Sequence, residues 1–206
     1  MPTRTARDSL PGHRLRGVRH LIVDRDGVLN AEPAGGEFVR EPAQFHWLPG
    51  SLEALARLSA AGIRVSVASN QSGVGRGLMS VADLARVHAR MTESAAAAGG
   101  TIDAIFCCLH APDAGCECRK PAPGLLLAAL RASGIEPAAT LVIGDDARDI
   151  AAARAAGLAP ALVRSGKGRA VEQALADPTL PVYDDLGQLV EELLRDSAPA
   201  RQVAER

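Results

Sequence analysis

Short apolar runs alternate with stretches of helical spacing along most of the chain. The apolar runs predict strands at residues 21–23, 64–69, 102–108, 141–143, 158–163 and 180–183. The stretches between them place apolar residues three or four positions apart or carry helix-capping residues, and they predict helices at residues 51–61, 80–98, 123–133, 148–156, 169–176 and 186–194. This alternation predicts an α/β fold, with a Rossmann-like parallel sheet flanked by helices on both faces.

The predicted elements leave little room for a second domain. A length of 206 residues favours one domain, and a 47% share of hydrophobic residues is enough for an ordinary core. No insertion between Asp26 and Ser69 is large enough to form a separate cap domain. We expect a single domain over residues 18–196, with loose, polar ends at residues 1–17 and 197–206.

Charge and hydropathy exclude several classes of protein. The 23 Lys and Arg residues nearly balance the 24 Asp and Glu residues, whereas binding to nucleic acid requires a basic face. No uncharged apolar run approaches the ~18 residues that span a bilayer, and no apolar stretch follows the arginines of the first 17 residues as in a signal peptide. We therefore expect a protein that binds neither nucleic acid nor membrane. We also expect a monomer, and four clustered cysteines without a secretion signal favour a reducing cytoplasm.

Polar side chains stand where the predicted strands end. Asp24, Ser69-Asn70, Cys108 and Asp145 each stand at the carboxyl end of a different predicted strand, and open α/β sheets bind ligands beyond these ends. With Asp26, three carboxylates would meet there, and each like-charged pair at ~4 Å costs ~4 kcal/mol at an effective dielectric constant near 20. Such a cluster is typical of a Mg²⁺ site, because Mg²⁺ takes oxygen ligands.

The same residues suit phosphate chemistry. Asp24 and Asp26 lie two residues apart in a strand-end turn, so one could act as a nucleophile and the other as an acid and base. Lys120 precedes a predicted helix N-terminus, which favours an anion site. Taken singly, an Asp-x-Asp turn or a lone lysine is more often structural or solvated. Their combination favours a functional site.

All four cysteines lie between Cys107 and Cys118. Three of them and one histidine form a C-x-H…C-x-C pattern, and three thiolates with one imidazole complete a tetrahedral, structural Zn²⁺ shell. The predicted ligands, on a zinc loop over residues 108–118, are Cys108, His110, Cys116 and Cys118. Cys107 is left to pack as a small hydrophobe. The alternative is a set of reduced thiols without metal.

Four motifs in order carry a family resemblance. They are Asp24-Arg25-Asp26-Gly27, Ser69-Asn70, Lys120 and the segment G-D-D-A-R-D at residues 144–149. With them, residues 21–163 resemble the haloacid dehalogenase (HAD) superfamily of aspartate-nucleophile phosphatases. The longer segments S-N-Q-S-G at 69–73 and C-R-K-P-A-P-G at 118–124 resemble, within it, the heptose bisphosphate and histidinol phosphatase family.

The resemblance implies a role for each residue. Asp24 would form an aspartyl-phosphate and Asp26 would act as the acid and base, while Ser69 and Lys120 would bind the transferring phosphoryl group. The Mg²⁺ ligands would be Asp24, the backbone carbonyl of Asp26 and Asp145, with support from Asp146 or Asp149. The residues expected to touch the substrate are Asn70, Gln71, Ser72, Arg76 and Arg119, with residues 32–36 and the zinc loop as walls.

The resemblance also implies a substrate. The expected activity is Mg²⁺-dependent removal of the 7-phosphate of D-glycero-D-manno-heptose 1,7-bisphosphate, a step in nucleotide-activated heptose biosynthesis. Hydrolysis of histidinol phosphate or another small sugar phosphate uses the same motifs and stays open. A third reading, a non-catalytic phosphosugar-binding scaffold, is disfavoured because binding alone does not require the nucleophile Asp24.

Overall fold

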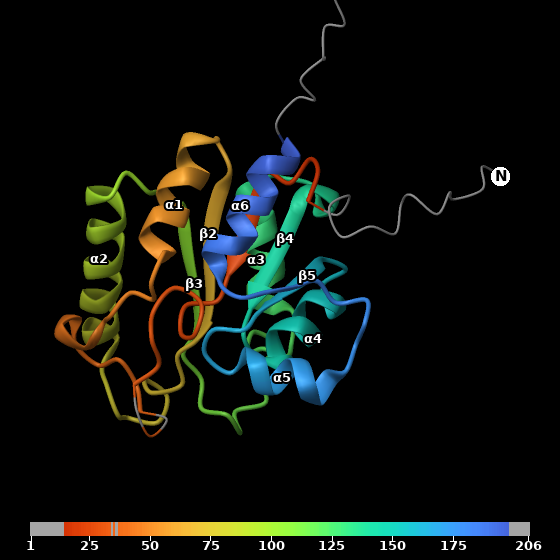
Figure 1. The fold of residues 1–206 in the computed structure, drawn as a ribbon. Coiled ribbons are helices and arrows are strands. Elements are labelled where there is room, and N and C mark those ends of the chain that lie inside the picture. Colours follow the sequence, from red (N-terminus) through yellow and green to blue (C-terminus); the bar gives the residue numbers. More distant parts are fainter. Residues whose placement is uncertain (1–14, 34, 36, 198–206) are drawn as a thin grey trace, which may run out of the picture.

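A parallel sheet forms the centre of the protein in a computed structural model that describes residues 15–33, 35 and 37–197 (Figure 1). Its strands are β1 (His20–Val23), β2 (Arg64–Asn70), β3 (Ala104–Cys108), β4 (Thr140–Gly144), β5 (Ala159–Val163) and β6 (Val182–Tyr183). The strand order is β3-β2-β1-β4-β5-β6, and every neighbouring pair runs parallel. The predicted Rossmann-like sheet is confirmed, with all six strands in the predicted places.

The connections between strands are helical, as predicted. The helices are α1 (Ser51–Ala60), α2 (Val81–Ala97), α3 (Gly124–Ser133), α4 (Ala147–Ala155), α5 (Gly168–Leu175) and α6 (Leu186–Ser197), with short 3-10 helices η4 (Pro42–Gln44) and η5 (Pro137–Ala139). The predicted capping box of α2 is present, since Ser80 and Asp83 bond to each other's backbone N–H. A second capping box, between Asp146 and Asp149, starts α4 at the end of β4.

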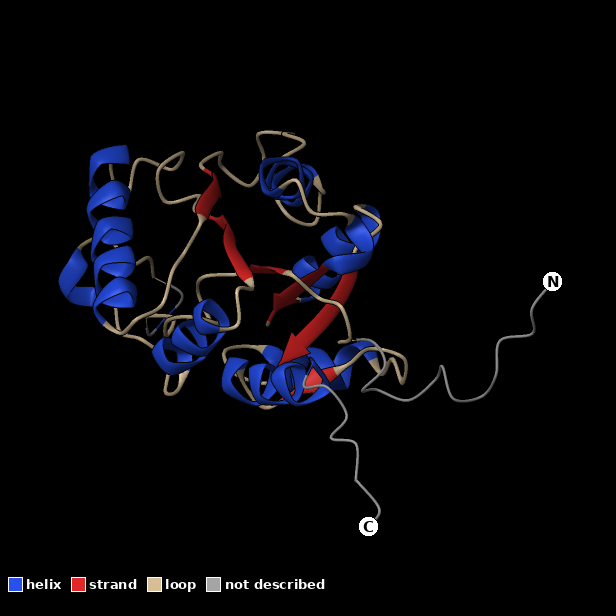
Figure 2. Ribbon diagram, turned by 90° about the horizontal axis from the view of Figure 1, so that it is seen from above, coloured by secondary structure: helices blue, strands red, loops and turns tan. Residues whose placement is uncertain are grey.

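Helices cover both faces of the sheet (Figure 2). Alternate residues of β1 divide between two cores: Leu21 and Val23 pack with α1, α2 and α6, whereas Ile22 packs with α3 and α4. β1 and β4 are buried along their whole length. Burial on both faces explains why these two strands read as unbroken apolar runs in the sequence.

The strand order fixes where a ligand can bind. The chain leaves β1 toward β2 but leaves β4 toward β5, although β1 and β4 are neighbours. The two connections therefore diverge beyond the carboxyl ends of these strands and open a crevice there. Asp24 and Asp145, each the first residue after its strand, both stand at this crevice.

The expected loose ends fall mostly on residues 1–14 and 198–206, which lie outside the described residues. Within the described part, Leu15 is 1% exposed and belongs to the core that includes Leu21 and Val23. None of the described helices has both the length and the apolar character needed to cross a membrane.

His20 gives the fold a pH-dependent stability. It is fully buried, its Nε2 atom lies 2.9 Å from Ser66 Oγ, and burial, helped by the Arg64 charge, lowers the pKa of His20 from 6.5 to about 4. The unfolded chain therefore takes up this proton first as the pH falls. We predict that the contribution of neutral His20 to the free energy of unfolding is complete above about pH 6.5. This contribution is lost as the pH falls from 6.5 toward 4.

Denaturant unfolding at several pH values measures this effect. Between pH 7 and pH 5, the wild type should lose about 2 kcal/mol more unfolding free energy than His20→Asn does. His46→Asn, which removes an exposed imidazole, serves as the control and should follow the wild type. Equal pH dependence in the wild type and His20→Asn would show that His20 is not the responsible group.

Candidate active site

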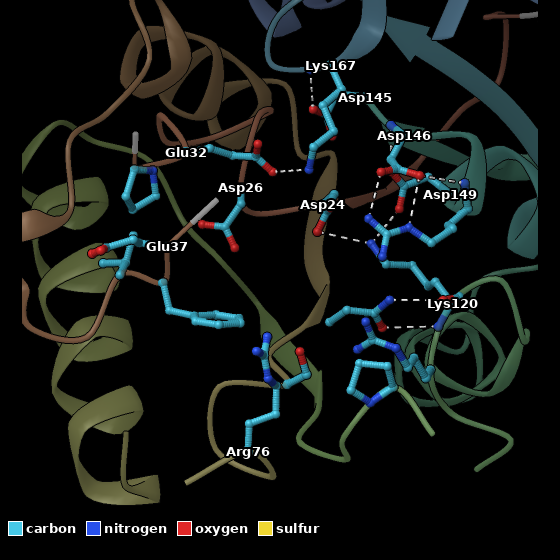
Figure 3. A pocket seen from close by; sticks show the side chains of 18 residues that line it. Asp24, Asp26, Glu32, Glu37, Arg76, Lys120, Asp145, Asp146, Asp149 and Lys167 are labelled. Atoms are coloured by element: carbon cyan, nitrogen blue, oxygen red, sulfur yellow. Dashed lines mark hydrogen bonds and ion pairs between the residues drawn. The ribbon is translucent and has the colours of Figure 1, made fainter. Parts of the chain in front are cut away.

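The carboxyl ends of β1 and β4 border a charged cavity of about 300 Å³ (Figure 3). Acidic and basic side chains share its lining. They are Asp24, Asp26, Glu32, Glu37, Asp145, Asp146 and Asp149 on one hand, and Arg76, Arg119, Lys120, Arg148 and Lys167 on the other. Such a lining suits a ligand that carries negative charge together with a cation.

Lys120 is buried against two of these carboxylates. Its Nζ atom lies 3.0 Å from Asp24 Oδ1 and 2.5 Å from Asp149 Oδ1, and it donates to the Ala68 carbonyl oxygen at 2.8 Å. Burial alone would lower the pKa of Lys120, but the charges of Asp149 and Asp24 outweigh it and raise the pKa. The lysine is therefore a fixed positive charge beside Asp24.

Asn70 holds the backbone that carries this lysine. Its Nδ2 atom donates to the Lys120 carbonyl oxygen at 3.0 Å, and the Lys120 N–H donates to Asn70 Oδ1 at 3.1 Å. Asn70 also lines the cavity. Asn70, which was predicted to contact the substrate, thus links the end of β2 to the backbone of Lys120.

Three carboxylates converge where the resemblance implies a metal. Asp24, Asp145 and Asp149 each offer one oxygen, and these oxygens lie within 4.8 Å of one another. Burial, together with the neighbouring carboxylates, raises the pKa of Asp145 to about 8 and that of Asp24 to about 7. Buried carboxylates this close fit a hard divalent cation, which would offset their mutual repulsion.

The structure distinguishes the two aspartates that the sequence left open. Asp149 is 1% exposed and belongs to the carboxylate group. Asp146 caps α4 and forms an ion pair with Arg148 at 2.7 Å. The side chain of Asp26 lies outside the carboxylate group, so the use of its backbone carbonyl as a metal ligand stays a prediction.

Gly27 allows the β1 turn to approach Asp145. Its φ angle is +83°, and a Cβ atom at this position would lie 2.1 Å from Asp145 Oδ2. Any side chain here would therefore displace that carboxylate. This close approach explains on steric grounds why the D-R-D-G motif has glycine at position 27.

Ser69 and Gln71 lie beneath the cavity rather than in its lining. Each is 1% exposed, and Gln71 Nε2 donates to Ser69 Oγ and to Asp26 Oδ2, both at 2.8 Å. Burial would raise the pKa of Asp26, but the Arg25 charge and hydrogen bonds from Arg25, Asn30 and Gln71 lower it.

The remaining residues expected to touch the substrate line the cavity. Ser72, Arg76 and Arg119 all contribute to it, and the Arg76 guanidinium lies 5.7 Å from the centre of the Phe38 ring. The Nη1 atom of Arg119 is buried and has no hydrogen-bond partner among the described residues. These two arginines supply positive charge in addition to Lys120.

Sequence reasoning missed Lys167. Its backbone N–H donates to Asp145 Oδ2 at 2.8 Å, and its Nζ atom lies 2.5 Å from Glu32 Oε1 across the cavity (Figure 3). Lys167 stands in the turn after β5, so the strand-end rule that identified Asp24 could have found it. Arg148, which stands at the same distance after β4, could have been found in the same way, whereas Phe38, which also lines the cavity, gave no such signal.

The four predicted zinc ligands converge in the loop before Lys120. Their sulfur atoms are 3.3 to 3.6 Å apart, and His110 Nδ1 lies 3.3 Å from Cys118 Sγ and 3.5 Å from Cys108 Sγ. A tetrahedral ion with Zn–S bonds of about 2.3 Å needs donors about 3.8 Å apart, so the set fits zinc with modest expansion. Cys107 lies outside it, 3.9 Å from His88 Nε2, and burial raises the pKa of its thiol to about 11.

Comparisons with known proteins match most of the chain. Residues 117–189 match a family model described as HAD-hydrolase-like. The chain is 44% identical over 184 residues to D-glycero-beta-D-manno-heptose-1,7-bisphosphate 7-phosphatase of Bordetella bronchiseptica, covering 87% of this chain and 100% of the relative. It is 42% identical over 176 residues to the protein of the same name from Pseudomonas aeruginosa, covering 85% and 97%.

A solved structure resembles the fold as well. The crystal structure of D,D-heptose 1,7-bisphosphate phosphatase from B. bronchiseptica, complexed with magnesium and phosphate, has a TM-score of 0.81 and 42% sequence identity. The match covers 87% of this chain and 100% of that one.

The Cys-His cluster yields a prediction about zinc. Cys116→Ser should reduce the zinc content well below one ion per chain, because it removes one of four ligands. Cys107→Ser is the matched control and should keep about one zinc per chain. Elemental analysis of the purified proteins decides the matter, and loss of zinc on changing Cys107 but not Cys116 would refute this ligand set.

Proposed function

Since the chain belongs to the HAD-like hydrolases, in the family of the D-glycero-D-manno-heptose-1,7-bisphosphate 7-phosphatases, we propose that it removes the 7-phosphate of this heptose bisphosphate. The observation that carries the proposal is the contact of buried Lys120 with buried Asp149 and half-buried Asp24 beside the cavity, in a chain that matches such a relative over its full length. The names of the two relatives support the β anomer as substrate.

The reaction uses Asp24 and Asp26 in turn. Asp24 attacks phosphorus, the bond from phosphorus to the sugar oxygen breaks, and Asp26 protonates the departing oxygen. Asp26 then takes a proton from the water that attacks the aspartyl-phosphate, which releases phosphate and frees Asp24. Although the pKa of Asp26 is low in the free protein, a negatively charged phosphate nearby favours the protonated acid.

Fixed positive charge stabilises the phosphoryl group during transfer. Lys120 binds the phosphoryl oxygens, and its burial keeps this charge in place without reorganisation. The Ser69 hydroxyl lies beneath the site and accepts a hydrogen bond from Gln71. Mg²⁺, held by Asp24, the backbone carbonyl of Asp26 and Asp145 with Asp149 beside them, would offset the charge of the same oxygens.

The second phosphate of the substrate explains the additional arginines. Arg76 and Arg119 line the cavity with Asn70 and Ser72, where their positive charges would attract an anion. In this proposal these residues hold the sugar and its 1-phosphate, while the 7-phosphate meets Lys120 and Asp24. Gln71 supports the site from beneath and does not touch the sugar.

A structural Zn²⁺ completes the proposal. Four protein ligands leave no position for a reacting water, so zinc would brace the loop that leads from Cys118 directly into Arg119 and Lys120. We further propose a cytoplasmic monomer that acts on this small phosphosugar without nucleic acid or membrane, in keeping with the balanced charge of the chain.

Phosphate release from a panel of substrates tests the proposed function. We expect kcat/KM for the heptose 1,7-bisphosphate to exceed that for histidinol phosphate at least about a hundredfold, because two phosphates engage the two groups of cations. Product analysis should find the 1-phosphate retained. A higher kcat/KM for histidinol phosphate, or release of the 1-phosphate instead, would contradict the proposal.

A further inference from the structure

The Asp26 carboxylate is held by three residues that do not line the cavity. Its Oδ1 atom accepts from Arg25 Nη2 at 2.8 Å and from Asn30 Nδ2 at 2.9 Å. Its Oδ2 atom accepts from Arg25 Nη2 at 2.9 Å and from Gln71 Nε2 at 2.8 Å. Both oxygens are therefore fixed from behind, on the side away from the cavity.

These donors are rigid because they are buried. Arg25 and Gln71 are 1% exposed and Asn30 is fully buried, and they come from the β1 turn and from the segment after β2. The Arg25 guanidinium is also bounded by α2, since its Nη1 atom lies 3.5 Å from His88 Nε2. A substrate in the cavity cannot replace them without repacking the core beneath it.

Gln71 connects Asp26 to a second residue of the site. One amide group donates to Asp26 Oδ2 and to Ser69 Oγ, both at 2.8 Å, while its Oε1 atom has no partner among the described residues. Rotating the amide by half a turn would place that oxygen against the Asp26 carboxylate. Asp26 Oδ2 and Ser69 Oγ therefore fix the orientation of the Gln71 amide. The amide in turn holds both acceptor atoms in place.

We propose that Gln71, supported by Asn30 and Arg25, is a positioning residue that directs the Asp26 carboxyl toward the departing sugar oxygen. The inference rests on the proposed function, in which Asp26 donates that proton. Proton transfer requires a donor within hydrogen-bond reach of the oxygen, and a displacement of about 1 Å can lower the rate about a hundredfold. Without Gln71, Oδ2 keeps only its hydrogen bond from Arg25, so the carboxyl is held less firmly in this orientation.

Two substrates with different leaving groups separate this role from a general structural one. A sugar alkoxide must be protonated as it leaves, whereas 4-nitrophenolate leaves readily without a proton. The parameter kcat/KM reports the steps up to departure of the leaving group, and therefore registers loss of the acid only for the sugar phosphate. The ratio of kcat/KM for the heptose bisphosphate to that for 4-nitrophenyl phosphate is the readout.

We expect Gln71→Leu, in the Mg²⁺-supplemented full chain, to lower this ratio about tenfold to a hundredfold, and Asp26→Asn to lower it at least as far. Gln44→Leu makes the same substitution at an exposed glutamine whose Oε1 atom accepts the Arg40 backbone N–H, and it should leave the ratio unchanged. Asn30→Ala removes the donor to the other oxygen and should also lower the ratio. This second variant keeps the test decisive if Gln71→Leu fails to fold.

The outcomes distinguish failure of the proposed Gln71 role from failure of the proposed function. If Gln71→Leu lowers kcat/KM equally for both substrates, the glutamine acts on phosphate binding or on folding alone, and the inference is wrong. An unchanged ratio in a folded Asn30→Ala would likewise contradict it. If the wild type hydrolyses neither substrate, or if Asp26→Asn leaves the ratio unchanged, the proposed function or the role of Asp26 fails instead.

Discussion

A surplus of buried negative charge governs this site. Asp24, Asp145 and Asp149 crowd one edge of the sheet, and the ammonium group of Lys120 contacts Asp24 and Asp149. Removing charges from water costs several kcal/mol per ion unless each has a partner in a fixed place. Three carboxylates and one ammonium leave a net negative charge, which favours a divalent cation. In the proposed mechanism, the phosphate binds beside Lys120.

The surrounding fold supplies those fixed places. Asn70 holds the backbone of Lys120 through two hydrogen bonds, and the Ala68 carbonyl oxygen accepts from its ammonium group. Gly27 lets the first turn close on Asp145, while the backbone N–H of Lys167 reaches the same carboxylate from the turn after β5. Each of these contacts joins different strand ends, so the parallel sheet is a precondition of the site.

Much of this arrangement could be predicted from the sequence. β1 and β4 are buried on both faces and therefore form clear apolar runs, and the strand-end rule then assigns Asp24 and Asp145 to one edge. Which side chains of these segments are buried beneath the cavity could not be predicted in this way. The S-N-Q-S segment at the end of β2 does not reveal that Gln71 turns inward to donate to Asp26, because that contact depends on how two separate turns pack.

The central claim is that Asp24 becomes phosphorylated during turnover. Heptose 1,7-bisphosphate carrying ³²P in its 7-phosphate, mixed with the enzyme and quenched in acid within milliseconds, should leave the label on the peptide that contains Asp24. The label should be released by hydroxylamine, as an acyl phosphate is, and should be absent from Asp24→Asn. Label on another residue, or normal turnover with no labelled enzyme at any quench time together with activity in Asp24→Asn, would contradict the account.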